Sequence, residues 1–101
     1  MPFVSSSILF LRTIGEPTPM TERVTFGTNI TTAVALLTGF HVEFSKAIGK
    51  DHPLGRIVVQ VDATPATATE VDVTARLGLR DWSGDWDDPY EGVVFFTVYA
   101  E

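Results

Sequence analysis

Cysteine is absent from the 101-residue chain. Its absence excludes disulfides and thiolate metal sites, but it leaves the compartment open, because a cysteine-free protein can reside in either redox environment. Histidine is scarce as well. The two that are present, His41 and His52, lack the short fixed spacing that brings two imidazoles onto one metal ion. The sequence therefore predicts no metal centre and no cofactor.

Basic residues are also few. Seven lysines and arginines stand against thirteen aspartates and glutamates, which gives a net charge of −6. A chain with this charge is repelled by a phosphate backbone and by an anionic membrane surface. Nucleic acid is therefore not expected as a partner.

Long apolar runs are missing too. The apolar stretch 8–11 is interrupted by Arg12 before it reaches the roughly 7 to 15 residues of a signal-peptide core. The longest weakly polar run, Ala33 to Phe40, is far shorter than the ~20 residues of a membrane-spanning helix. We expect a soluble protein without membrane insertion or a cleavable signal, either cytoplasmic or released by a route that needs no signal.

What the chain does contain is sufficient apolar material for one core. Its length and its 45% hydrophobic content fit a single domain over residues 1–101. Apolar and polar residues alternate with the period of two that is typical of half-buried strands in three segments, 40–45, 56–62 and 71–77. Shorter strands are expected at Ser7 to Ile14 and Glu22 to Phe26.

One segment, Ile30 to Leu37, is ambiguous, because its alanines and leucines favour a helix and its β-branched residues favour a strand. We interpret it as a strand that ends in a bend or bulge at Thr38-Gly39. The turn-like segments Ile48 to Gly55 and Ala63 to Thr69 separate the later strands. Six or seven short strands in this arrangement predict an all-β fold, a small antiparallel β-sandwich.

The C-terminal segment Val93 to Tyr99 is apolar on both faces of the expected strand. Such a strand either is covered on both sides or buries one face in the fold and the other against a partner. The sequence therefore predicts a homo-oligomer. We expect the interface on the face that carries Val94, Phe96 and Val98.

The loop Asp81 to Glu91 combines carboxylates with aromatic rings. Asp81, Ser83 and Asp85 match the first positions of a calcium-binding loop, but Trp86 stands where that loop needs glycine. Aromatic rings beside carboxylates and an arginine also suit a sugar, whose apolar faces stack on rings while its hydroxyls form hydrogen bonds. A third interpretation is structural, in which the tryptophans close the end of the sandwich.

Catalysis is a weaker interpretation of the same loop. Asp85 or Asp88 beside Glu91 would resemble the carboxylate pair of a glycosidase. A domain of this size has little room for the cleft that desolvates the acid, and the sequence has no nucleophile elbow or phosphate-binding glycine loop. We therefore expect a protein that is not an enzyme.

From Arg23 onward the chain resembles an H-type lectin domain. The resemblance rests on Val24-Thr25-Phe26, on Ala33 to Gly39, on the arginine-led strand Arg56 to Ala63, and on Trp82 ahead of the terminal Tyr99-Ala100. It implies a six-stranded antiparallel sandwich that forms trimers and binds N-acetylgalactosamine-like sugars at the ends of its subunit interfaces. Arg56 and Trp82 are the positions that match sugar contacts of the family.

Three features depart from the family pattern: the longer acidic insert Gly84 to Glu91, the segment 95–99 in place of a closing tryptophan strand, and the impossibility of the usual disulfide. The leading hypothesis is a non-enzymatic, oligomeric, carbohydrate-binding module, a trimer or a multiple of one. The alternative is an assembly protein that self-associates through its C-terminal strand and has no small-molecule ligand. The expected ligand-binding residues are Arg56, Arg80, Asp81, Trp82, Asp85, Trp86 and Tyr90.

Overall fold

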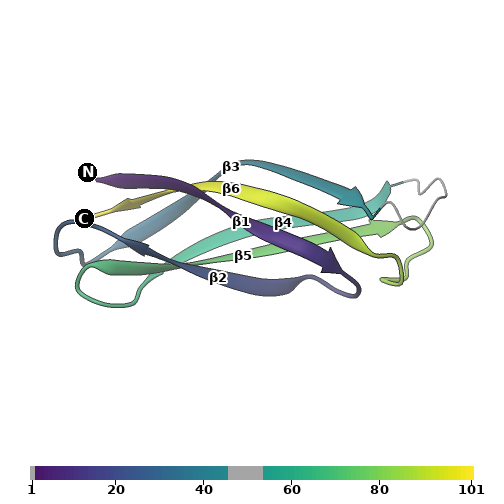
Figure 1. Ribbon diagram of the computed structural model, residues 1–101, viewed down its shortest axis with the longest axis horizontal. Coiled ribbons are helices and arrows are strands. Elements are labelled where there is room, and N and C mark those ends of the chain that lie inside the picture. The colour runs from purple at the N-terminus through teal and green to yellow at the C-terminus, as the bar shows by residue number, and fades with distance from the viewer. Residues whose placement is uncertain (1, 46–53) are drawn as a thin grey trace.

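Six antiparallel strands form two facing sheets in the computed structural model, which describes residues 2–45 and 54–101 (Figure 1). Sheet A has the strand order β1-β6-β3 and sheet B the order β2-β5-β4. The strands are β1 (Phe3–Thr13), β2 (Thr18–Thr25), β3 (Ala33–Phe44), β4 (Leu54–Pro65), β5 (Glu70–Asp81) and β6 (Tyr90–Ala100). The predicted small antiparallel β-sandwich is confirmed. A search of the described residues finds no helix long and apolar enough to cross a membrane.

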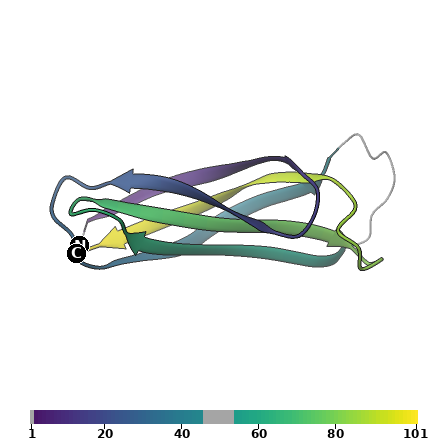
Figure 2. The ribbon, with the colours of Figure 1, turned by 90° about the horizontal axis from the view of Figure 1, so that it is seen from below.

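The sandwich is long and narrow, with extents of 49 × 18 × 17 Å. Both termini lie at one end, which we call the terminal end (Figure 1). The connections β1–β2 and β5–β6 lie at the opposite end, which we call the loop end, and the view from below shows the same arrangement (Figure 2).

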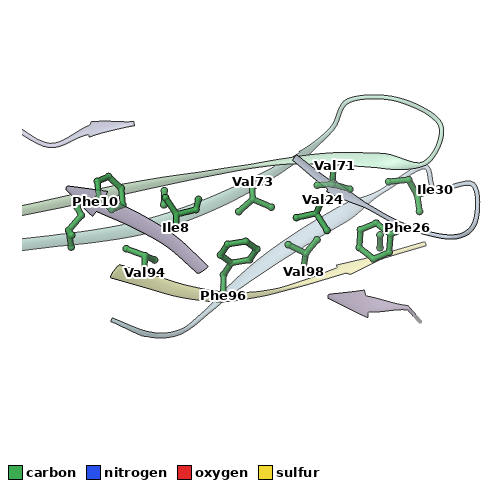
Figure 3. Packing of buried hydrophobic residues seen from close by; sticks show 13 residues of the cluster. Ile8, Phe10, Val24, Phe26, Ile30, Val71, Val73, Val94, Phe96 and Val98 are labelled. Carbon is green, nitrogen blue, oxygen red and sulfur yellow. The ribbon is translucent and has the colours of Figure 1, made fainter. Parts of the chain in front are cut away.

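The two central strands supply most of the core. Alternate residues of β5 and of β6 point into the space between the sheets and are closed to solvent (Figure 3). The β6 residues in this set are Val94, Phe96, Val98 and Ala100, so the prediction that the first three form a subunit interface is wrong. They lie in the core because β6 is the middle strand of sheet A and this face of it meets sheet B.

Several strand boundaries also differ from the prediction. The bend or bulge expected at Thr38-Gly39 is present as a register irregularity between Leu37 and Gly39, but β3 does not end there and continues to Phe44. The second strand begins at Thr18 rather than at the expected Glu22, and it includes Pro19, which it tolerates because β2 is an edge strand. Most of the turn predicted at Ile48 to Gly55, with His52, lies outside the described residues.

Candidate functional site

The loop end carries most of the residues expected to bind a ligand. Asp81 ends β5, and its carboxylate accepts hydrogen bonds from the backbone N–H and the hydroxyl of Ser83. Gly84 follows with a φ of +90°, a left-handed conformation that favours glycine. Arg80 then donates from Nη1 to the Gly84 carbonyl at 3.2 Å, and its guanidinium lies 5.3 Å from the ring centroid of Trp86. These contacts fold the loop back onto the end of β5.

A close approach of two backbones brings β4 to the same place. The register shifts between Leu54 and Arg56, and Arg56 stands opposite Arg80. Gly55 lies at the shift, where a Cβ atom would come within 2.1 Å of the Asp81 carbonyl oxygen. Only glycine permits this contact, so it sets the position of Arg56 beside the loop.

Two of the expected ligand-binding residues have opposite environments. Trp82 is 75% exposed at the loop end, where its indole is open to solvent. Tyr90 is fully buried, and its hydroxyl donates to the Gly15 carbonyl at 2.9 Å. The structure therefore places Tyr90 in the interior, where it fastens the β1–β2 connection, and it has no surface to offer a ligand. Asp85 is exposed and Trp86 is partly buried.

The loop end presents an open surface in the described residues. The described residues enclose no pocket, and they hold no group of three histidine, aspartate or glutamate side chains arranged for a metal ion. Glu91, one of the carboxylates considered for hydrolysis, lies on β6 opposite Glu43. A general acid of raised pKa needs a desolvated site. The exposed surface offers instead an aromatic ring with guanidinium and carboxylate groups nearby.

A second candidate site covers the solvent-facing side of sheet A, which we call the outer face of sheet A. The residues between the core positions of β6 turn outward, and those of β1 and β3 in register with them do the same. Many of these side chains are large, apolar and open to solvent: Phe3 is 62% exposed, Leu9 61% and Phe95 44%. From the terminal end, the cross-strand rows are Phe3–Tyr99–Val34, Ser5–Thr97–Leu36, Ser7–Phe95–Gly39 and Leu9–Val93–His41.

The outer face of sheet B is different. There Arg23 forms a double contact with Asp72, at 3.0 and 3.3 Å, and the hydroxyls of Thr21 and Thr74 lie 3.0 Å apart. Arg23 also holds the pKa of the Asp72 carboxyl below its ordinary value through this hydrogen bond. Sheet B therefore has the polar surface of a solvated sheet, and sheet A does not.

Sequence reasoning identified the two-faced C-terminal strand but missed the contribution of the other strands of sheet A. A signal was present in β1, where Phe3, Leu9 and Leu11 are exposed while Ile8 and Phe10 are buried. This edge strand is apolar on both faces, as β6 is. A strand of this kind at an edge, beside one at the centre, indicates that apolar side chains of the outer face extend across neighbouring strands.

Comparisons of the chain with protein-family models, with curated proteins and with solved structures find no match. The resemblance to H-type lectins therefore rests on the sequence features alone.

The buried hydroxyl of Tyr90 predicts a specific alkaline instability. Burial raises its pKa above the ordinary value of 10.0, so the unfolded chain ionises this group first and stability falls as the pH rises past 10. At pH 7, Tyr90→Phe should have a free energy of unfolding about 1 kcal/mol below that of the wild type, because the hydrogen bond is gone. Between pH 9 and about pH 11, the free energy of unfolding of Tyr90→Phe should fall by less than that of the wild type. Urea unfolding measured across this range checks both. Equal alkaline losses in the two proteins would contradict the assignment.

Proposed function

We propose that this protein is a non-enzymatic module that self-associates through the outer face of sheet A. The observation that carries the proposal is the contrast between the two outer faces of one small sandwich. Sheet B is covered by charged and hydroxyl side chains, whereas sheet A exposes Phe3 in the first of its four rows, Phe95 in the third and Leu9 in the fourth. Apolar patches of this kind are rare on monomeric proteins and mark interaction surfaces.

A second copy of the chain is the occupant that fits the electrostatics. The chain carries a charge of −6, so two copies repel each other unless they meet where charge is absent. The four rows listed above hold no ionised residue except His41 when it is protonated. Near the middle, the hydroxyls of Ser5 and Thr97 lie 2.8 Å apart, so one donates to the other and that hydrogen bond is kept when the face is covered.

The size of the face is adequate. The two larger extents of the molecule, 49 and 18 Å, enclose about 880 Å². Typical stable interfaces bury ~800 Å² from each partner. The apolar rows occupy the terminal end and the middle of this rectangle, so the face is large enough for a concentration-dependent association at the lower end of that size range.

Carbohydrate recognition at the loop end is the second proposal, and it would make the assembly lectin-like. It is supported by the exposed indole of Trp82, which lies next to Asp81 in the chain and at the same end as Arg56. An indole face stacks on the apolar side of a pyranose, and the charged neighbours supply donors and acceptors for its hydroxyls. Several copies in one assembly would raise the avidity of such shallow sites.

Replacing Phe95 by aspartate tests the association surface. A carboxylate on this face would have to be buried in the assembly, so Phe95→Asp should shift the protein to a folded monomer at concentrations where the wild type is oligomeric. Sedimentation velocity and circular dichroism measure the two properties. A wild-type protein that stays monomeric at 100 μM would overturn the proposal.

Two variants serve as controls. Phe96→Asp changes the neighbouring residue, which points into the core, and should unfold the chain rather than dissociate it. Gln60→Asp adds the same charge to the exposed polar face of sheet B and should leave both the fold and the assembly unchanged. Dissociation by Gln60→Asp to the same extent as by Phe95→Asp would show that net charge, and not this face, governs association.

Replacing Trp82 by alanine tests the second proposal. The side chain is largely outside the core, so Trp82→Ala should abolish binding on a glycan array while thermal stability and sedimentation stay those of the wild type. Met20→Ala, which removes an exposed apolar side chain from β2, should leave glycan binding intact. A wild-type protein that binds no glycan with or without calcium would refute carbohydrate recognition and leave self-association standing.

A further inference from the structure

We infer that the associated copies run in the same direction, so that the loop ends of all copies lie together at one end of the assembly. This inference rests on the proposed self-association. Two outer faces of sheet A can meet in two symmetric ways. A rotation axis along the strands keeps all copies pointing one way, whereas an axis across the strands places the loop end of one copy on the terminal end of the other.

The outer face of sheet A changes character along its length. At the terminal end its first row consists of Phe3, Tyr99 and Val34, and the rings of Phe3 and Tyr99 are 5.8 Å apart. At the loop end the outward positions become charged. Glu43 stands directly opposite Glu91, and Nε2 of His41 lies 3.9 Å from the Glu43 carboxylate. The apolar part of the face is therefore widest at the terminal end and in the middle, and at the loop end it narrows to Leu11 on the edge strand β1.

An arrangement with opposed directions would bury these carboxylates. Each copy would place Glu43 and Glu91 on the Phe3–Tyr99 row of the other, at both ends of the interface. Removing carboxylates from water is strongly unfavourable, Glu43 would keep only its 3.9 Å contact with His41, and two like charges side by side add their repulsion. The outward residues of the terminal end are therefore suited to burial, and those of the loop end are not.

An arrangement with a common direction avoids this cost. The apolar terminal ends then meet each other, and the carboxylates gather at the rim near the loop end. Packed sheets cross at about 30° because each is twisted, so strand ends can diverge and keep the rim in water. The charged row thus orients the copies.

The consequence for function is the position of the loops. With a common direction, the Trp82 side chains of all copies lie at the same end of the assembly. A surface that displays many ligands is then reached by every copy at once. With opposed directions the loops would lie about one molecular length, 49 Å, apart and would bridge two separate surfaces.

Fluorescence energy transfer between single cysteines tests the direction, and the cysteine-free chain makes the labelling specific. Ser83→Cys marks the loop end, and Ala66→Cys marks the exposed β4–β5 turn at the terminal end. In oligomers of labelled Ser83→Cys we expect a separation of one to two molecular widths, each 18 Å. In oligomers that mix donor-labelled Ser83→Cys with acceptor-labelled Ala66→Cys we expect a separation near the full length of 49 Å.

The outcomes separate the two proposals. A separation near 49 Å between Ser83→Cys labels, with a short one in the mixed oligomers, would overturn the common direction and leave self-association intact. No energy transfer in any sample, together with monomers in sedimentation, would overturn self-association and this inference with it.

Discussion

The packing of β6 between two neighbours in sheet A is the constraint on which the rest of the structure depends. Successive side chains of a strand point to opposite sides of its sheet. Once Val94, Phe96 and Val98 fill the space against sheet B, the residues between them must face outward. No further described strand or helix covers that side, so the apolar residues on it stay in contact with solvent.

The outer faces of the two sheets therefore differ in polarity. The outer face of sheet B carries ion pairs and hydroxyl groups, and its middle strand β5 has apolar residues on the inner face only. Sheet A has a middle strand that is apolar on both faces and an edge strand, β1, with the same property. An isolated sandwich needs only one apolar face per sheet, and the second apolar face of sheet A is the observation that supports the proposed self-association.

Residue preferences were enough to predict a strand within Ile30 to Leu37, which begins at Ala33, and a bend or bulge at Thr38-Gly39, because these depend on local residues. Period-two patterning was enough to predict the sandwich. It did not identify the buried side of β6. Val94 and Phe95 are equally apolar, and the choice between them is made by contacts with residues distant in the chain. Contacts distant in the chain also decide the loop end. Arg56 stands opposite Arg80 in the register, and this pairing requires Gly55 because a Cβ atom there would clash with the Asp81 backbone. Tyr90 was misassigned because its partner, Gly15, lies on a remote connection.

The central claim is that the outer face of sheet A is covered by another copy of the chain. Hydroxyl-radical footprinting over a range of protein concentrations measures this coverage residue by residue. The account predicts that Phe3, Phe95 and Tyr99 become protected from oxidation as the concentration rises, while Trp82 at the loop end reacts at a constant rate. Unchanged oxidation of Phe95 across that range, or protection of Trp82 in its place, would contradict it.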